Sequence, residues 1–239
     1  MKELIDIAYP IRTSATPEQD QLLKYSLRSL EKHGGNFGKV WMIGRRRPWF
    51  SSMVKMCNID GHSEQRGKAN SLIIKLSTFC AMDKKFVLMS DDFILLKNIS
   101  ITWAHYRALP SINNVVRQTT DILYRKMLQK SLQDNGNGLK DAPAFITHTP
   151  MLIDRPKLMA KICRGTSFRQ DYALRRGLHK HPLTEIIEYD VQVTERHSVE
   201  KWPSAFAGHG QVSISGWAMD KNLFEVLDVM FPNKSKYER

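Results

Sequence analysis

Two adjacent carboxylates, Asp91 and Asp92, interrupt an apolar run over residues 86–96. The length and composition of this run predict a buried strand, and a buried carboxylate is costly unless a cation or a hydrogen-bond donor pairs with it. Carboxylate oxygens are the hard ligands that suit Mg²⁺ or Mn²⁺. The pattern therefore indicates a divalent-cation site at the end of a strand, and two solvated aspartates in a strand-end turn are the alternative.

An amphipathic helix is predicted to begin near Thr16, well before this run. Thr16, Pro17 and Gln19 have the spacing of a capping box with proline at the first helical position. Leucines then recur at helical spacing, and Gly34 is of the residue type that ends a helix. A helix with one apolar stripe of this kind is expected to pack against a sheet.

Strand patterns over residues 4–9 and 39–44 flank that helix, and a second helix pattern over 69–82 leads into the run that carries Asp91 and Asp92. This alternation of strands and helices predicts an α/β fold with a mostly parallel central sheet and helices on both faces. Ligands bind at the carboxyl ends of the strands in such sheets, and the two aspartates are expected at that edge.

The pattern is less regular beyond residue 101. It contains no internal repeat and no linker, so a single domain over residues 1–239 is predicted. The expected elements of this half are a long helix from residue 115 up to a loop at 134–138, a strand over 144–147, helices over 158–163 and 168–176, a strand over 185–194 and a last helix over 223–230.

The composition has one unusual feature, a formal net charge of +12 over 239 residues. Such a charge indicates a polyanionic partner, such as nucleic acid, or a strongly anionic substrate, such as a nucleoside diphosphate. No apolar segment approaches the length of about 18 residues that spans a membrane, and residues 1–6 do not resemble a signal peptide. A cytoplasmic protein with no membrane partner is therefore predicted. Three scattered cysteines argue against a disulfide framework and against a zinc site.

Basic residues gather in two segments, residues 45–47, next to Trp49 and Phe50, and residues 163–181. The solvated surface of a basic protein would give such clusters, but arginines beside aromatic rings also suit a groove that tracks phosphates and stacks bases. No helix-turn-helix, zinc-finger or RNA-binding signature accompanies them, so a sequence-specific regulator is not predicted. The arginines expected to line this groove are Arg45, Arg46, Arg47, Arg175 and Arg176.

The apolar run with its two aspartates resembles the DXD-type strand end of GT-A glycosyltransferases. Its Asp-Asp-Phe form is similar to that of phage-encoded, DNA-modifying sugar transferases and of the related Stealth-type sugar-phosphate transferases. The segment Ser90-Asp91-Asp92 departs from a strict Asp-x-Asp motif. The other matching segments are residues 25–30, 40–44, 68–71, 148–150, 152–154 and 231–238, which cover most of the chain in the expected order.

The resemblance implies a GT-A-like fold with a nucleotide-sugar half at about residues 1–100 and an acceptor half at about 101–239. It implies a metal-dependent enzyme that moves a sugar from a nucleotide-sugar donor, expected to be a UDP-sugar, to a hydroxyl acceptor. Asp92 would hold Mn²⁺ or Mg²⁺, with Asp91 as a second ligand or as its support. The residues expected to bind the donor are Tyr9, Pro10, Arg12, Lys68 and Asn70.

A catalytic base is expected if the enzyme inverts the configuration of the sugar, because a carboxylate must then accept the acceptor's proton. Asp171 is the first candidate, since nearby arginines would keep it ionised. Asp154 and Glu185 are alternatives. His148 is expected to contact the acceptor. His209, in a glycine-flanked loop, would approach the metal or serve only as a polar turn residue.

The net charge and the phage resemblance favour DNA with a hydroxymethylated pyrimidine as the acceptor, modified in the host cytoplasm. Such a base would have to be flipped or presented at a groove, which suits a basic rim. Three alternatives stay open: the same enzyme acting on a glycan or small molecule, a Stealth-type sugar-phosphate transferase, and a nucleic-acid-binding protein without catalysis. A glycan enzyme would not need the basic clusters, and a binding module would not need Asp91 and Asp92.

Overall fold

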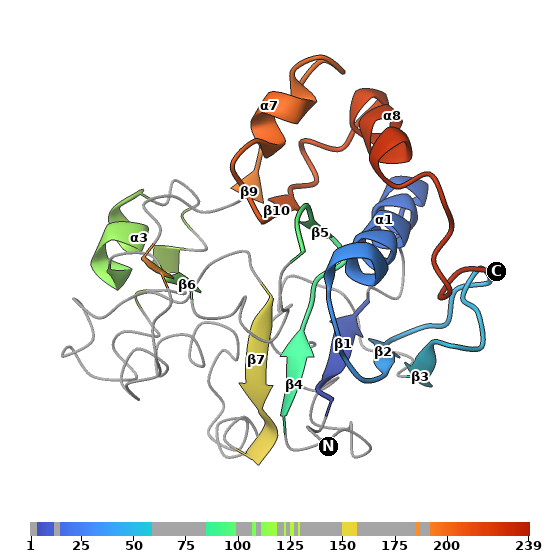
Figure 1. Ribbon diagram of the computed structural model, residues 1–239. Helices are drawn as coiled ribbons and strands as arrows, with labels where there is room; N and C mark the ends of the chain where they lie inside the picture. Colours follow the sequence, from blue (N-terminus) through green and yellow to red (C-terminus); the bar gives the residue numbers. More distant parts are fainter. Residues whose placement is uncertain are drawn as a thin grey trace.

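The computed structural model describes residues 4–11, 15–58, 85–98, 107–108, 111–118, 150–156, 185–186 and 192–239, with residues 122, 125, 126 and 129. Figure 1 shows how the strands and helices formed by these residues are arranged. The elements are β1 (Asp6–Pro10), α1 (Pro17–His33), β2 (Val40–Ile43), β3 (Lys55–Cys57), β4 (Lys85–Leu88), β5 (Phe93–Leu95), β6 (Arg107–Ala108), α3 (Ile112–Gln118), β7 (Met151–Asp154), β8 (Glu185–Ile186), β9 (Gln192–Val193), α7 (Trp202–Phe206), β10 (Gln211–Ile214) and α8 (Lys221–Met230).

The main sheet has five strands in the order β3-β2-β1-β4-β7. The first four are parallel, and β7 joins the edge of β4 in the antiparallel direction. In Figure 1 the arrowheads of β4 and β7 accordingly point in opposite directions. The prediction of a mostly parallel sheet is confirmed, and the carboxyl ends of β1, β2 and β4 meet at one edge.

Helix α1 begins and ends as its sequence predicts. The Thr16 hydroxyl accepts a hydrogen bond from the Gln19 main-chain N–H at 3.3 Å, and the Gln19 side chain accepts one from the Thr16 N–H at 3.0 Å. At the other end the Gly34 N–H donates to the Leu30 carbonyl at 2.8 Å. The apolar stripe of α1 packs on the face of the sheet that carries Ile7 and Tyr9. These local signals and the apolar stripe together account for the helix.

The opposite face of the main sheet is equally withdrawn from water. Its residues include Ala8 on β1 and Phe86 on β4, which are 0% and 1% exposed. Side chains on both faces of these strands are therefore buried, as expected for a parallel sheet that is covered on both faces.

The apolar run over residues 86–96 is two strands rather than the single strand that was predicted. Strand β4 belongs to the main sheet, whereas β5 pairs with β10 in a second sheet of order β5-β10-β9. Between them the chain turns at residues 90–92, where the Phe93 N–H donates to the Ser90 carbonyl at 3.2 Å. Serine and aspartate favour such turns, so the two aspartates break the run and still follow the end of a buried strand.

Several other elements differ from the expectation. The helix predicted from residue 115 up to the loop at 134–138 begins as α3, which ends at Gln118, and residues 122, 125, 126 and 129 beyond it are also helical. The strand predicted over 185–194 appears at its two ends as β8 and β9. Helix α8 is confirmed and begins at Lys221, because the Asp220 side chain caps it by accepting from the Leu223 N–H at 2.9 Å. Strands β3, β6, β7 and β10 and helix α7 were not predicted. The segments 69–82, 144–147, 158–163 and 168–176 lie outside the described residues.

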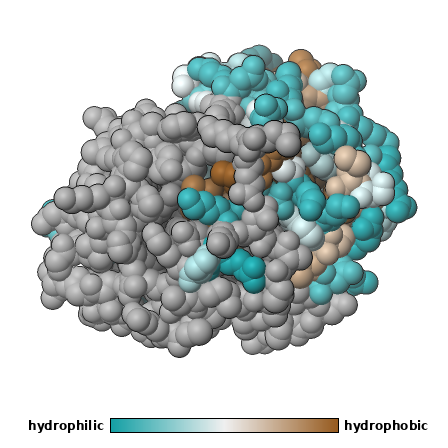
Figure 2. All heavy atoms as spheres, turned by 60° about the horizontal axis from the view of Figure 1, so that its bottom comes forward, coloured by the Kyte–Doolittle hydropathy of each residue, from teal (hydrophilic) through white to brown (hydrophobic). Residues whose placement is uncertain are grey.

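Two apolar cores are formed by the described residues. One lies between α1 and the main sheet, and the other joins β5, β10, α7 and α8 around the buried Trp202. No helix in the described part of the chain is both long and apolar enough to cross a membrane. Figure 2 shows one face of the molecule, on which the coloured surface is mostly hydrophilic and hydrophobic atoms form small separate patches.

Candidate active site

The two aspartates lie where parallel strands end. The Met89 N–H donates to the Ala8 carbonyl at 2.9 Å, which continues the pairing of β4 with β1 up to the turn. The ends of β1 and β4 are therefore adjacent, and Pro10 lies beside the turn that carries Asp91 and Asp92. This adjacency at the carboxyl edge was predicted from the order of the elements.

Tyr9 is linked to this turn through the Ser26 hydroxyl of α1. Its ring is fully buried, and its hydroxyl hydrogen-bonds the Ser26 hydroxyl at 3.2 Å, which in turn donates to the Ser90 carbonyl at 3.5 Å. Burial raises the pKa of the Tyr9 phenol well above its usual value, and the nearby Asp91 carboxylate adds to the rise. The side chain is thus a neutral link between β1, α1 and the turn. The nucleotide contact predicted for this strand end would fall to the main chain and to the residues that follow Tyr9.

Asp92 is held at two points by β10. Its carboxylate Oδ2 accepts a hydrogen bond from the Ser213 hydroxyl at 2.8 Å, and its main-chain carbonyl accepts one from the Ile214 N–H at 2.9 Å. The other carboxylate oxygen, Oδ1, is buried and receives no hydrogen bond within the described part of the chain. A buried oxygen without a donor costs about 1–3 kcal/mol, more when it is charged, so it needs an explanation.

Asp6 shows what the fold does with a buried carboxylate that has only a structural role. Its Oδ1 accepts from the Lys39 N–H at 2.6 Å and its Oδ2 from the Trp41 indole N–H at 2.8 Å. Both oxygens are satisfied by the protein itself. Asp92 differs because one oxygen is left for a partner that the described residues do not supply.

Asp91 precedes Asp92 on the same turn. It is half-buried and accepts a hydrogen bond from the Ser90 hydroxyl at 3.3 Å. In the described part of the chain, no group of three or more His, Cys, Asp or Glu side chains could enclose a metal ion. One or two carboxylates at the end of a strand are instead the ligands with which Mg²⁺ is bound together with substrate phosphates and water. The donor set therefore fits the predicted Mn²⁺ or Mg²⁺.

Strand β10 and the residue that follows it carry a row of polar side chains. Gln211, Ser213 and Ser215 alternate with apolar residues that pack in the second core, so they share one side of the strand. Both polar atoms of the Gln211 side chain and the Ser215 hydroxyl are buried, with no hydrogen-bond partner among the described residues. Sequence reasoning missed this row, and the polar–apolar alternation of residues 211–215 was the signal that could have found it.

His209 is not near the aspartates. Leu96 donates its N–H to the Gly210 carbonyl at 2.9 Å, whereas Asp92 is bonded to Ile214 at the other end of β10. Four residues of strand, about 13 Å, separate these two contacts. The approach to a metal expected for His209 is therefore wrong, and the alternative of a polar residue in a glycine turn applies, with Gly208 at a φ of +80°.

Asp154, an alternative catalytic base, lies at the edge of the main sheet opposite to the one that carries Asp91 and Asp92. It pairs with Lys85, the first residue of β4, while Asp91 and Asp92 follow the last residue of that strand. The main chain of Asp154 thus lies at the amino edge of the sheet. Glu185 is in β8, which pairs with β6 away from the main sheet.

The arginines that follow β2 have three different environments. Arg47 is buried, and its Nε is 2.9 Å from an Asp20 carboxylate oxygen, so it is a structural ion pair. Arg46 is exposed and donates to the carbonyls of Phe50 and Ser51 at 3.4 and 3.2 Å. Arg45 is exposed. The loop follows the carboxyl end of β2, so Arg45 and Arg46 lie at the same edge of the sheet as the aspartates.

The aromatic residues of this loop do not form the stacking platform that was expected. Phe50 is 0% exposed and belongs to the core beneath α1. Trp49 packs edge-on against Phe50 with ring centroids 4.5 Å apart, and the Lys24 ammonium lies 5.3 Å from its ring. Both rings are used within the protein, because the loop must close over the core.

A groove of about 1110 Å³ runs between the first turns of α1 and helix α8. Gly216, two residues beyond the strand that holds Asp92, forms part of its wall. Next to it Trp217 is 83% exposed, and the Arg196 side chain donates to its carbonyl at 3.1 Å. The charged side chains that line the groove are Glu18, Arg196, Asp220, Lys221, Glu225 and Asp228.

The remaining predicted site residues lie outside the described part of the chain. They are Arg12, Lys68, Asn70, His148, Asp171, Arg175 and Arg176.

No protein-family model and no curated protein sequence matches this chain. Solved structures match it in fold. A galactosyltransferase, LgtC, in complex with donor and acceptor sugar analogs, has a TM-score of 0.50 at 12% identity over 97% of this chain and 98% of that chain. The bifunctional glycosyltransferase WbbM in its apo form has a TM-score of 0.55 at 9% identity over 98% of this chain and 50% of that chain. With the sheet described above, these likenesses identify an α/β fold of the GT-A type.

Proposed function

We propose that this protein is a glycosyltransferase that moves a sugar from a nucleotide-sugar donor, a UDP-sugar, to a hydroxyl acceptor. The observation that carries the proposal is the buried, unpartnered Oδ1 of Asp92 at the carboxyl end of β4. It stands beside a second carboxylate, Asp91, on a fold shared with solved glycosyltransferases. An enzyme of this class needs carboxylate oxygens at that edge to hold the cation that accompanies a diphosphate.

Asp91 and Asp92 would hold Mn²⁺ or Mg²⁺, which supplies neutralising charge to a diphosphate leaving group. Asp92 offers Oδ1 because Ser213 already occupies Oδ2. Pro10 and Arg12 would bind the nucleotide at the end of β1, next to the turn. Lys68 and Asn70 are proposed for the phosphates and the nucleoside, and Asp171 for the proton of the acceptor hydroxyl.

The first candidate for the acceptor is DNA that carries a hydroxymethylated pyrimidine. The net charge of +12 and the exposure of Arg45 and Arg46 at the carboxyl edge support it. These two arginines, together with Arg175 and Arg176, would contact phosphates, and His148 would contact the base or its hydroxymethyl group. A DNA acceptor predicts binding that weakens steeply as salt rises.

A glycan is the second candidate, and the groove between α1 and α8 favours it. Its charged lining has four carboxylates and two cations, a balance that does not attract a DNA backbone. Carboxylates and the amides of Gln19 and Gln21 suit sugar hydroxyls as hydrogen-bond partners. The exposed Trp217 beside the groove offers an apolar ring face to the apolar face of a sugar.

A transfer assay tests the function and separates the two acceptors. The protein is incubated with Mn²⁺ and a panel of UDP-sugars, with either hydroxymethylated duplex DNA or a set of oligosaccharides, and the products are identified by mass spectrometry. Asp92→Asn is the inactive control. A mass increase of one hexose on nucleosides supports the DNA acceptor, and an increase only on oligosaccharides supports the glycan. Absence of both transfer and donor hydrolysis with every donor would contradict a glycosyltransferase.

A further inference from the structure

The carboxylate of Asp92 has two oxygens in different surroundings. Oδ2 accepts from the Ser213 hydroxyl at 2.8 Å, and Oδ1 is buried without a partner among the described residues. The last torsion of an aspartate side chain is soft, so rotation of the carboxylate is not prevented by the side chain itself. A single hydrogen bond from a fixed hydroxyl is enough to select one orientation.

We infer that Ser213 is a positioning residue, which orients the Asp92 carboxylate so that Oδ1 faces the divalent cation. The inference rests on the proposed function, because it assigns Ser213 a task only if Asp92 binds a cation. Side chains that hydrogen-bond a metal ligand fix its geometry, and their loss lowers metal affinity about 10–100-fold.

The Ser213 hydroxyl is itself held rigidly. Ser213 is 0% exposed and lies opposite Phe93 in the pairing of β10 with β5. Its neighbours Val212 and Ile214 are anchored in the second core, and the Ile214 N–H also holds the Asp92 main chain at 2.9 Å. Strand β10 therefore fixes both the backbone and the side chain of Asp92, although the two segments are 121 residues apart.

A purely structural role for Ser213 would predict a different result. The hydrogen bond would then contribute only to folding, and its removal would leave cation affinity unchanged. Ser215 provides the matched comparison. It is on the same side of β10, and its buried hydroxyl has no hydrogen-bond partner among the described residues. Removing that hydroxyl leaves the bonds of Asp92 intact.

The test measures binding of Mn²⁺ to the full chain with and without UDP, by the loss of the free-ion signal in electron paramagnetic resonance. Ser213→Ala is expected to raise the Kd for Mn²⁺ about tenfold or more. Ser215→Ala should leave it within about twofold, and Ser213→Thr, which keeps the hydroxyl, should retain most of the affinity. Thermal unfolding identifies any variant that fails to fold, and Ser213→Ala and Ser213→Thr provide two independent readings.

The outcomes separate the inference from the function on which it rests. An unchanged Kd for Ser213→Ala, with normal binding to the original chain, would overturn the inference alone. An equal loss for Ser215→Ala and Ser213→Ala would also overturn it, because the effect would not depend on the bond to Asp92. No Mn²⁺ binding to the original chain, even with UDP, would overturn both the inference and the proposed cation site.

Discussion

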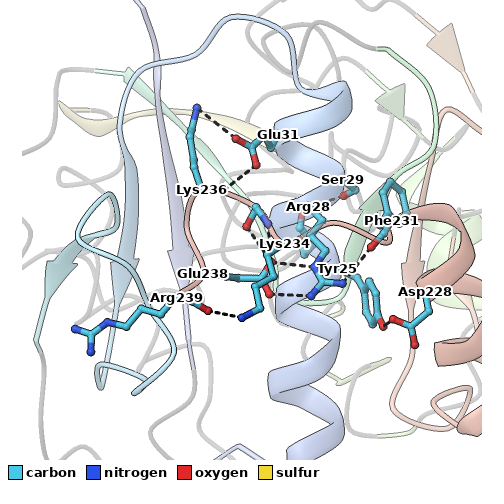
Figure 3. Close-up of polar contacts among 12 residues, drawn as sticks. Tyr25, Arg28, Ser29, Glu31, Asp228, Phe231, Lys234, Lys236, Glu238 and Arg239 are labelled. Carbon is cyan, nitrogen blue, oxygen red and sulfur yellow. Dashed lines mark hydrogen bonds and ion pairs between the residues drawn. The ribbon is translucent and has the colours of Figure 1, made fainter.

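Two polar regions of this protein are built in opposite ways. In the first, the C-terminal segment over residues 231–239 lies on α1, where Glu238 and Lys236 pair with Arg28 and Glu31 of that helix (Figure 3). In the second, at the turn between β4 and β5, the carboxylate oxygen Oδ1 of Asp92 is buried without a partner among the described residues. Charged groups that are paired internally stabilise a fold, whereas an unpaired carboxylate oxygen is available to a cation.

The paired region is dense. Arg28 donates through Nε and one terminal nitrogen to the two carboxylate oxygens of Glu238, both at 2.9 Å, and through the other to the Phe231 carbonyl at 3.1 Å. The Tyr25 hydroxyl donates to the Asp228 carboxylate, and the Lys236 ammonium lies 3.8 Å from a Glu31 carboxylate oxygen. In Figure 3 these side chains converge from α1, α8 and the C-terminal segment. Such a two-point pairing of Arg with a carboxylate is geometrically specific and leaves little capacity for a ligand.

The same segment also holds the basic loop after β2. Phe50 pairs with Glu238 across an isolated bridge, the Ser51 N–H donates to the Tyr237 carbonyl at 2.9 Å, and the Arg239 N–H donates to the Trp49 carbonyl at 2.9 Å. The loop that carries Arg45 and Arg46 is therefore fixed by the end of the chain. The conformation of this loop therefore depends on the paired region. The loop itself lies at the carboxyl edge of the main sheet, where Asp91 and Asp92 also lie.

The largest expected effect is the loss of activity in Asp92→Ala, which removes the cation ligand of the unpaired region. Loss of the cation ligand should lower donor turnover by at least about 100-fold, since a bound metal contributes several kcal/mol to charge stabilisation. Asp91→Ala should impair turnover strongly but less. Donor hydrolysis is followed by release of UDP, and the unfolding temperature is measured beside it. An Asp92→Ala variant that is folded and keeps full activity in EDTA would refute the role.

The reverse pattern is expected from Glu238→Ala. It leaves the Arg28 guanidinium without its partner in a largely buried place, which should cost about 3 kcal/mol of unfolding free energy. Turnover per folded molecule should stay unchanged. Urea unfolding measures the loss, and Lys234→Ala, which removes an exposed contact to the Arg239 carbonyl, is the control with a change below about 0.5 kcal/mol. Equal stability of the two variants would show that the pairing contributes nothing.

The pH dependence of stability should sharpen the comparison. Burial alone would raise the pKa of Glu238, but the hydrogen bonds from Arg28 and Ser235 outweigh it and hold the pKa below its ordinary value of 4.5. A carboxyl with a lower pKa when folded stabilises the protein above the unfolded pKa, and this contribution is lost as pH falls through the folded pKa. Urea midpoints between about pH 6 and pH 3 should therefore fall less in Glu238→Gln than in the original chain.

The smallest effect is expected in the basic loop, where neighbouring arginines belong to different regions. Arg45→Ala should flatten the salt dependence of duplex DNA binding by about one unit, because one phosphate is then no longer neutralised, and leave stability unchanged. Arg47→Ala should lower the unfolding free energy by about 1–3 kcal/mol, because it breaks the bond to Asp20, with the salt slope unaltered. Fluorescence anisotropy at several salt concentrations measures the slope. Identical slopes for Arg45→Ala and the original chain would move the acceptor toward a glycan.

Local signals along the chain determined a definite part of this protein. The capping box at Thr16, the leucine stripe and Gly34 specify α1 and place each of its ends to within one helical turn. Each of these signals depends on residues three or four positions apart, so it can be recognised in the sequence alone. The alternation of strands and helices predicted the parallel order of the main sheet. The two aspartates after an apolar run predicted carboxylates at its carboxyl edge, because that inference needs only the end of one strand.

Only the tertiary structure decided what those carboxylates meet. Ser213 reaches Asp92 from 121 residues away through β10, a strand of four residues whose local pattern is weak. The same limit explains why β7 was missed, and why Arg47 and Phe50 were expected at the surface although the fold buries them. Short strands and buried charges are specified by partners distant in sequence, and their stabilisation comes from packing and pairing that a local pattern does not contain.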